Sequence, residues 1–257
     1  MHNYNMVIRP VKTRILNPPK DDLLQALSAS IKNIKEKSVI AITSKVVSIW
    51  QGRCLSTDKF KSKEEIIINQ ADWYLPRSFV PGARCMHCFK NNIFIPSAGI
   101  DESNGKGHYI LWPKKPKEVV KTLCRWFRKK YKIKNLGIII TDSHTVPMRR
   151  GVMGISLAHF GFDPLIDYRG KADLFGKLFK MSQANVADGL ASSAVLAMGE
   201  GAESTPVCII EDIPSVQFKS KIIKSKKSFS SFEIKAKEDI YYPFFSSVAW
   251  KKGKGEE

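Results

Sequence analysis

The feature that most constrains the fold is a short apolar run at residues 136–140, LGIII, which is typical of a strand buried on both faces of a sheet. The run stops at the polar residues TDSH, so that Asp142 directly follows the predicted strand. In open α/β sheets, ligands and metals bind just outside the carboxyl ends of strands. Residues up to Gly176 add arginines that bind phosphate, aspartates that bind hard cations, and glycines that let a ligand approach the backbone. We therefore expect a ligand site around this strand, although these residue types also occur in solvated loops.

The length and hydropathy of the chain indicate a globular protein. With 257 residues and 43% hydrophobic residues, the chain can bury a core as one large domain or as two that share an interface. No apolar run approaches the ~20 residues of a membrane span, and the N-terminal residues lack the apolar core of a signal peptide. We expect a cytoplasmic protein without a membrane partner.

The charge is strongly positive, at +18 from 42 Lys and Arg against 24 Asp and Glu. Such a balance attracts nucleic acid, anionic lipid or phosphorylated small molecules. Much of the excess lies in residues 114–134 and 219–227. Because the chain has no ribonucleoprotein-type aromatic pattern, zinc finger or helix-turn-helix, we favour a lysine-rich solvated surface over a nucleic-acid groove.

The five cysteines are scattered and odd in number, so they imply no disulfide framework. Cys85 and Cys88 have the spacing of half a zinc knuckle, but no second ligand pair follows. We therefore expect free thiols rather than structural zinc.

The periodicity of apolar residues predicts alternating strands and helices. A helix capped by Asp21 or Asp22 follows the first strand, and Pro116 opens a basic amphipathic helix that ends near Tyr131. The C-terminal residues 251–257, KKGKGEE, look disordered. The predicted strands are residues 7–17, 38–50 with a polar interruption at 43–45, 92–96, 136–140, 207–210 and 231–242, and the other helices are 64–73 and 185–198.

Four polar motifs follow or precede apolar elements, and each is ambiguous when taken alone. Ser44 and Lys45 can hold phosphate or form an outward polar step in a strand. The motif around Asp101 is explained equally well by turn chemistry. Glu200 lies in a glycine-bearing turn that also serves as a plain helix C-cap. The fourth motif is Asp142 with the paired arginines downstream.

Together these motifs give the chain a resemblance to the coenzyme F420-0:L-glutamate ligase (γ-glutamyl ligase) family. The resemblance covers residues 7–211, and its separated motifs agree in order and spacing. They are DDL at 21–23, ITSKVVS with QGR at 42–53, AGIDESN at 98–104, TDS with arginine at 141–150, DYRGKADLFGK at 167–177 and NVADGLASSAVLAMGEG at 185–201.

The resemblance implies an α+β fold with a mixed-sheet ligase core, which we place at residues 1–211. The lysine-rich composition and alternating pattern of the remaining residues predict a smaller β region at 212–257. It implies a homodimeric, GTP-dependent enzyme that joins the amine of L-glutamate to a carboxylate acceptor through an acyl-phosphate, with Mg²⁺ or Mn²⁺. The metal ligands implied are Asp101, Asp142, Ser143 and Glu200. The nucleotide contacts implied are residues 14–17, Ser44, Lys45, Asn104, Met198, Gly199, Gly201 and Thr205.

The chemistry of the residues agrees with this implication. Phosphoryl transfer to a carboxylate needs oxygen ligands for a divalent metal and cations for the developing charge. The three carboxylates supply hard oxygens, and Lys45 with Arg149 or Arg150 supplies the cations. No cysteine or serine nucleophile is required.

The chain departs from the family at three places, which leaves the nucleotide and the acceptor open. Ile49 stands at a family lysine position, Ser143 stands where threonine is common, and residues 14–17 replace a Leu-Pro-like segment. One alternative is a ligase that acts on a folate-like pterin or another carboxylate. The alternative from a different class is a basic nucleic-acid-binding protein on an inactive ligase scaffold.

Overall fold

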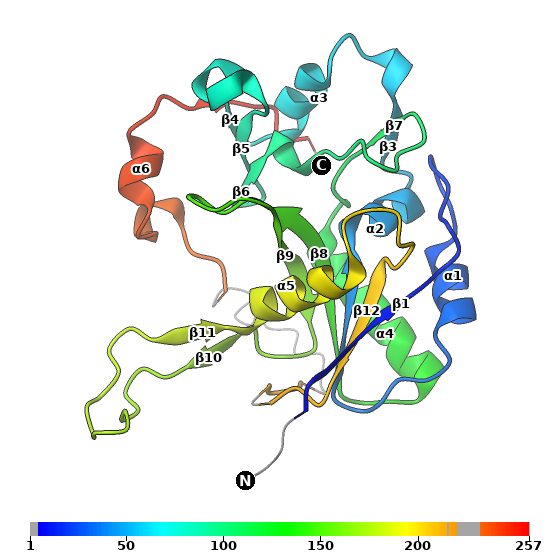
Figure 1. Ribbon diagram of the computed structural model, residues 1–257, viewed down its shortest axis with the longest axis vertical. Helices are drawn as coiled ribbons and strands as arrows, with labels where there is room; N and C mark the ends of the chain where they lie inside the picture. The colour runs from blue at the N-terminus through cyan, green and yellow to red at the C-terminus, as the bar shows by residue number, and fades with distance from the viewer. Residues whose placement is uncertain (1–4, 215, 220–231, 257) are drawn as a thin grey trace.

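The centre of the molecule is a mixed five-stranded sheet (Figure 1). The computed structural model describes residues 5–214, 216–219 and 232–256. Only β2 and β8 pair in parallel, whereas the other neighbouring strands are antiparallel. The predicted mixed α+β fold is thereby confirmed. In spatial order the strands are β1 (Val7–Val11), β12 (Val207–Glu211), β2 (Ser38–Thr43), β8 (Leu136–His144) and β9 (Met153–Phe160).

Helices cover both faces of this sheet, because the central strands are apolar on both sides. In β2, Val39 and Ala41 belong to the apolar cluster under α5 (Val186–Met198), which crosses one face in Figure 1. Ile40 and Ile42 point into the opposite cluster with α1 (Leu23–Ser30) and α4 (Pro116–Tyr131). The alternation along one buried strand therefore accounts for the three layers.

Helix α4 and the start of α1 follow the sequence prediction closely. Pro116 begins α4, whose buried face includes Val120, Leu123 and Phe127. The Asp22 side chain caps α1 by accepting a hydrogen bond from the Gln25 amide. Such caps satisfy backbone donors that have no partner within the helix.

A second, smaller sheet lies beside the core and carries the loop that leads to Asp101. Helix α3 (Lys63–Gln70) packs beneath it, with Ile66 and Ile67 against Ala98 and Ile100. The strands in order are β13 (Lys251–Lys252), β4 (Trp73–Leu75), β5 (His87–Lys90) and β6 (Ile93–Pro96). Two further pairs are β3 (Cys54–Ser56) with β7 (His108–Ile110), and β10 (Leu165–Asp167) with β11 (Gln183–Asn185).

Three predicted strands have other bounds than expected. The strand predicted at residues 7–17 stops at Val11, and residues 12–22 contain no helix or strand. The second half of the 38–50 prediction is a helix, α2 (Ser44–Gln51), whose apolar residues pack into the core along one face. The strand at 136–140 continues as β8 to His144, because β9 supplies it with an antiparallel partner. The pairing register shifts between Ile140 and Thr141, just before Asp142. The apolar runs thus predicted the positions of β2 and β8 but not the residues at which these strands end.

The C-terminal segment also differs from its prediction. From Phe232 onward, the described residues of the predicted 231–242 strand form a 3₁₀ helix, Ala236–Glu238, and the start of α6 (Tyr242–Ser246). No neighbouring strand pairs with the described part of that segment, and its apolar Ile234 and Ile240 stay exposed. Lys221, Lys224, Lys226 and Lys227 of the second basic cluster lie outside the described residues.

The tail that looked disordered is ordered up to Glu256. It pairs with the edge strand β4 and then follows the C-terminal end of α3. The amides of Lys254 and Glu256 donate to the carbonyls of Ile68 and Asn69 at 3.0 and 2.9 Å. The tail therefore donates to carbonyls that the end of a helix leaves unpaired. Its amino-acid composition alone gives no indication of this contact.

None of the helices in the part of the chain that the structure describes is both long and apolar enough to span a bilayer. All five cysteines are free thiols. Burial raises the pKa of Cys88 to about 12, so this thiol stays protonated at neutral pH.

Candidate functional site

A cavity of about 430 Å³ opens at the carboxyl ends of β2 and β8. Its volume lies in the range of small-molecule sites, ~300–1,000 Å³. Parallel pairing places Thr43 opposite Thr141, so the residues that follow these two threonines meet at one edge of the sheet. The site residues from the sequence that line this cavity are Lys45, Asp101, Asn104, Asp142, Ser143, Met198, Gly199, Glu200, Gly201 and Thr205.

Lys45 and Asp101 form the cationic and anionic centre of the cavity. The Lys45 Nζ lies 2.7 Å from Asp101 Oδ2 and donates to the Ser103 carbonyl at 2.8 Å. The amide and hydroxyl of Ser103 both donate to Asp101 Oδ1 at 2.8 Å. Burial by itself raises the pKa of Asp101, but Lys45 and the Ser103 donors lower it below its ordinary value. Asp101 is therefore ionised at neutral pH.

Asp142 is held by Trp112, a residue that the sequence did not single out. The Trp112 indole N–H donates to Asp142 Oδ2. Burial raises the pKa of Asp142 to about 7, because the nearby donor only partly compensates for lost hydration. Trp112 itself is buried and packs against Gly99, where a side chain would collide with the indole ring. No local sequence pattern points to this contact, since the residues are far apart in the chain.

The turn after α5 closes the opposite side of the cavity. The Ser143 hydroxyl donates to Glu200 Oε1 at 2.6 Å. The Asn104 side-chain amide donates to the Gly201 carbonyl at 2.9 Å, and the Gly201 amide donates to Glu203 Oε2 at 2.9 Å. These bonds connect motifs from three separate parts of the chain. Glu203, which lies in the Met198–Thr205 turn implied to contact the nucleotide but was not singled out, is part of this arrangement.

The donor chemistry of the cavity fits a hard divalent cation. Asp101, Asp142, Ser143 and Glu200 offer only oxygen donors, the ligands that Mg²⁺ and Mn²⁺ prefer. In this structure Asp101 contacts Lys45 and Ser103, one Asp142 oxygen accepts from Trp112, and one Glu200 oxygen accepts from Ser143. No three His, Cys, Asp or Glu side chains in the described residues are gathered closely enough to hold an ion. To hold an ion together, these side chains would have to turn from their present partners.

The N-terminus of α2 adds a feature suited to phosphate. Thr43 precedes the helix and makes no side-chain cap, although Thr43, Lys45 and Val46 line the cavity. Uncapped amides and the positive end of a helix dipole attract anions. Ser44 is buried in the first turn and is not a lining residue, whereas Ile49 contributes apolar wall.

Arg149 and Arg150 lie apart from the cavity. Both are exposed in the loop between β8 and β9, and neither lines the cavity. Within the described residues, the acceptor found for Arg149 Nη1 is the neighbouring Met148 carbonyl, at 3.3 Å. A catalytic role for either arginine would need movement of that loop.

The chain is similar to one family over most of its length. Residues 10–212 match the F420-0:gamma-glutamyl ligase family. The coenzyme F420:L-glutamate ligase of Methanopyrus kandleri is 30% identical over 226 residues, covering 80% of this chain and 86% of that relative. The ligase of the same name from Methanocaldococcus jannaschii is 40% identical over 122 residues, 47% of this chain and 48% of that relative. The one from Methanothermobacter thermautotrophicus is 27% identical over 206 residues, with coverages of 75% and 81%. The resemblance inferred from the motifs is confirmed, and the chain belongs to the F420-0:gamma-glutamyl ligase family, a family of amide-forming ligases.

Proposed function

We propose that the protein is a GTP-dependent, divalent-metal-dependent ligase that joins the amine of L-glutamate to a carboxylate acceptor of the F420-0 type. The acceptor carboxylate attacks the γ-phosphorus of GTP, which releases GDP and leaves an acyl-phosphate. The glutamate amine then attacks the acyl carbon, forms the amide and releases phosphate. The observation that carries the proposal is the meeting of Lys45, Asp101, Asp142 and Glu200 in one cavity.

The residues of the cavity fall into two groups, positive groups that would bind phosphate and oxygen donors that would bind the metal. Lys45 and the N-terminus of α2 would hold phosphate oxygens, because both present positive charge toward the cavity. Asp101, Asp142, Ser143 and Glu200 would hold Mg²⁺ or Mn²⁺. The metal, when bound, neutralises the triphosphate beside carboxylates that would otherwise repel it. Lys45 would then exchange its contact with Asp101 for one with phosphate.

Asp142 is the proposed metal ligand whose protonation would respond most to a bound cation. Its burial disfavours the charged form, so a neighbouring cation would favour loss of its proton. Ser143 donates a hydrogen bond to Glu200, which these two residues would give up to hold a cation. The carboxylates thus act as ligands, and the acceptor itself supplies the nucleophile.

The proposal includes a homodimer, which the β10–β11 arm supports. This arm projects away from the two sheets in Figure 1. Leu174 and Phe175 on it are 96% and 94% exposed, and Met181 is also exposed. Apolar residues gathered on a projecting element mark protein–protein contacts. Light scattering of the intact chain and of a Leu174→Asp, Phe175→Asp variant tests this part of the proposal, which a monomeric wild-type protein would contradict.

The direct test is a reaction with labelled components. Purified protein is incubated with Mn²⁺, labelled glutamate, GTP or ATP, and a panel of deazaflavin and pterin acceptors. We expect glutamate incorporation into a deazaflavin carboxylate with GTP. Incorporation into a pterin alone would favour the folate-like alternative. Salt-sensitive binding of nucleic acid without nucleotide turnover would instead favour the inactive-scaffold alternative.

A further inference from the structure

The loop between β1 and α1 forms one wall of the cavity. Arg14, Ile15 and Leu16 all line it, and the loop has no helix or strand of its own. Leu16 is buried in the core, and the Thr13 amide donates to the Ser204 carbonyl at 3.0 Å. Between these two anchors, Ile15 is 71% exposed, so apolar packing does little to fix it. Another interaction must set the position of this part of the wall.

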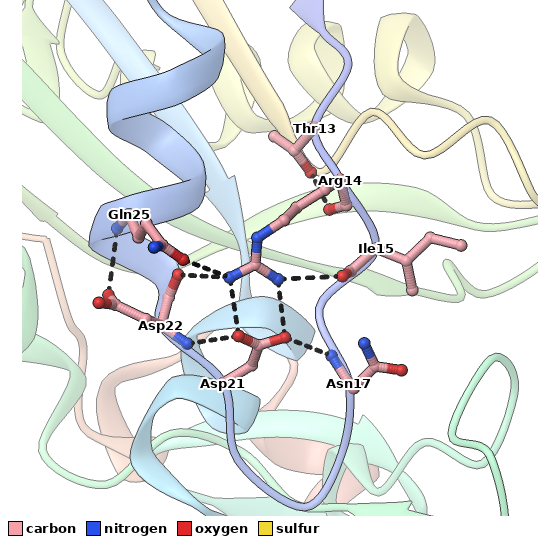
Figure 2. A network of polar contacts seen from close by, with 7 residues as sticks. All are labelled: Thr13, Arg14, Ile15, Asn17, Asp21, Asp22 and Gln25. Carbon is pink, nitrogen blue, oxygen red and sulfur yellow. Dashed lines mark hydrogen bonds and ion pairs between the residues drawn. The ribbon is translucent and has the colours of Figure 1, made fainter.

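Arg14 provides that interaction through its guanidinium (Figure 2). The two terminal nitrogens each donate to one oxygen of Asp21 at 2.8 Å, which is a bidentate ion pair. Nη1 also donates to the Ile15 carbonyl at 3.2 Å. Nη2 donates to the Asp22 carbonyl at 3.3 Å and to Gln25 Oε1 at 3.2 Å. One side chain therefore ties the exposed wall residue to the start of α1.

Asp21 is itself fixed by the backbone. Its Oδ2 accepts from the Asn17 amide at 2.9 Å, and its Oδ1 accepts from the Asp22 amide at 2.7 Å. These donors and Arg14 hold the pKa of Asp21 well below its ordinary value, with the Arg14 hydrogen bonds as the largest cause. Asp21, which is therefore ionised at neutral pH, links Arg14 and Asn17 of the loop to the start of α1. We refer to Arg14 and Asp21 together as the loop clamp.

We propose that Asp21 is a positioning residue of the nucleotide site, which acts through Arg14 to hold Ile15 and its backbone at the cavity wall. Asp21 does not itself line the cavity. The inference rests on the proposed function, since it assigns the wall at residues 14–16 to the nucleotide. A fixed wall lowers the conformational entropy that nucleotide binding has to remove. The loop clamp should therefore act on nucleotide affinity rather than on the rate of the chemical step.

The test is a double-mutant cycle with steady-state kinetics. Asp21→Asn and Arg14→Leu should each raise the KM for GTP by about fivefold, the loss expected for one partly exposed charge pair, with kcat within about twofold. Because Asp21 acts through Arg14, its replacement should have little further effect once Arg14 is gone, so the double variant should be no worse than Arg14→Leu. Arg14→Lys keeps the charge but cannot form the bidentate pair, so it should lie between wild type and Arg14→Leu.

A matched control comes from an ion pair elsewhere in the chain. Glu64 Oε1 lies 2.7 Å from Arg77 Nε, and neither residue lines the cavity. Glu64→Gln should leave the KM for GTP unchanged. Thermal unfolding of each variant shows whether it is folded at the assay temperature, and Arg14→Lys decides the question if Asp21→Asn is unfolded.

The outcomes separate this inference from the proposed function. If the wild-type protein neither binds nor turns over GTP, both fall together. If the wild type is active but the loop-clamp variants keep its KM, the inference is overturned and the proposed function stands. It is also overturned if the variants lose kcat instead of affinity, or if their effects on KM simply add.

Discussion

Gly99→Ala should damage the site through Trp112 although it adds a single methyl group. Gly99 has φ +70°, a left-handed conformation that residues with a Cβ rarely adopt. A Cβ there would lie 2.1 Å from two atoms of the Trp112 indole, far inside van der Waals contact. Trp112 is 3% exposed, and the interior of a protein is close-packed, so the ring cannot avoid the clash by moving into solvent. It also supplies the hydrogen bond that holds Asp142.

The expected magnitude has two parts. The left-handed backbone contributes about 1–2 kcal/mol for a residue with a Cβ. Overpacking of a buried ring contributes about 1–3 kcal/mol more. Gly107 separates these parts, because it has φ +75° but nothing within 4 Å of an added Cβ. Gly107→Ala should therefore lose only the backbone part.

Urea unfolding of the two variants measures the difference directly. Gly99→Ala should lose about 2–5 kcal/mol of unfolding free energy and Gly107→Ala about 1–2 kcal/mol. Glutamate incorporation should also fall in folded Gly99→Ala, because Asp142 loses its donor. Equal stability losses in the two variants would refute the steric argument at Trp112.

Three further predictions concern other parts of the molecule. Lys45→Ala should raise the KM for GTP or lower turnover about tenfold or more, the loss of one charge-assisted phosphate contact; unchanged steady-state kinetics would count against its role. Burial, with Lys117 and Lys219 nearby and Asp163 opposing them, lowers the pKa of His159 to about 4. Native His159 is therefore neutral while the unfolded chain takes up a proton below its ordinary pKa of 6.5, so stability should fall between pH 6.5 and 4. The unfolding free energy, measured in urea at each pH, should fall less in His159→Leu than in the wild type, by up to about 3 kcal/mol. Parallel pH dependences of the two proteins would contradict this. Gly253→Ala should release the tail, because its Cβ would lie 2.0 Å from the Ala71 carbonyl oxygen; hydrogen exchange at the Lys254 amide should then speed up, and unchanged protection would contradict the close packing.

Local periodicity predicted those elements whose own residues decide their conformation. Helix α4 was predicted from Pro116 and the spacing of Val120, Leu123 and Phe127. Helix α2 was missed because Val46, Val47, Ile49 and Trp50 form a nearly continuous apolar run, which a buried strand also shows. The end of β8 was missed because its partner β9 decides where the strand stops. The ordered tail depends on α3, more than 180 residues away by the printed numbering. The boundary at residue 211 between the ligase core and a C-terminal region stays a prediction.

The site could be predicted only as separate motifs. Asp101, Asp142 and Glu200 were found because each follows an apolar element, and the family resemblance grouped them. What brings them together is the parallel pairing of β2 with β8 and the turn after α5, which no local window contains. The contact of Trp112 with Asp142 and the pairing of Arg14 with Asp21 were missed for the same reason, because tertiary packing and a loop without periodicity bring these residues together.

The central claim, that the cavity holds a metal-dependent glutamate ligase, is tested most directly by one comparison. Labelled glutamate incorporation into a deazaflavin carboxylate is measured with GTP and Mn²⁺ for the wild type and for Asp142→Asn, which keeps the size of the side chain and removes its charge. We predict incorporation by the wild type and its loss in the variant, with circular dichroism and the thermal midpoint showing an intact fold. Full incorporation by Asp142→Asn, or none by the wild type with any acceptor, would contradict the account.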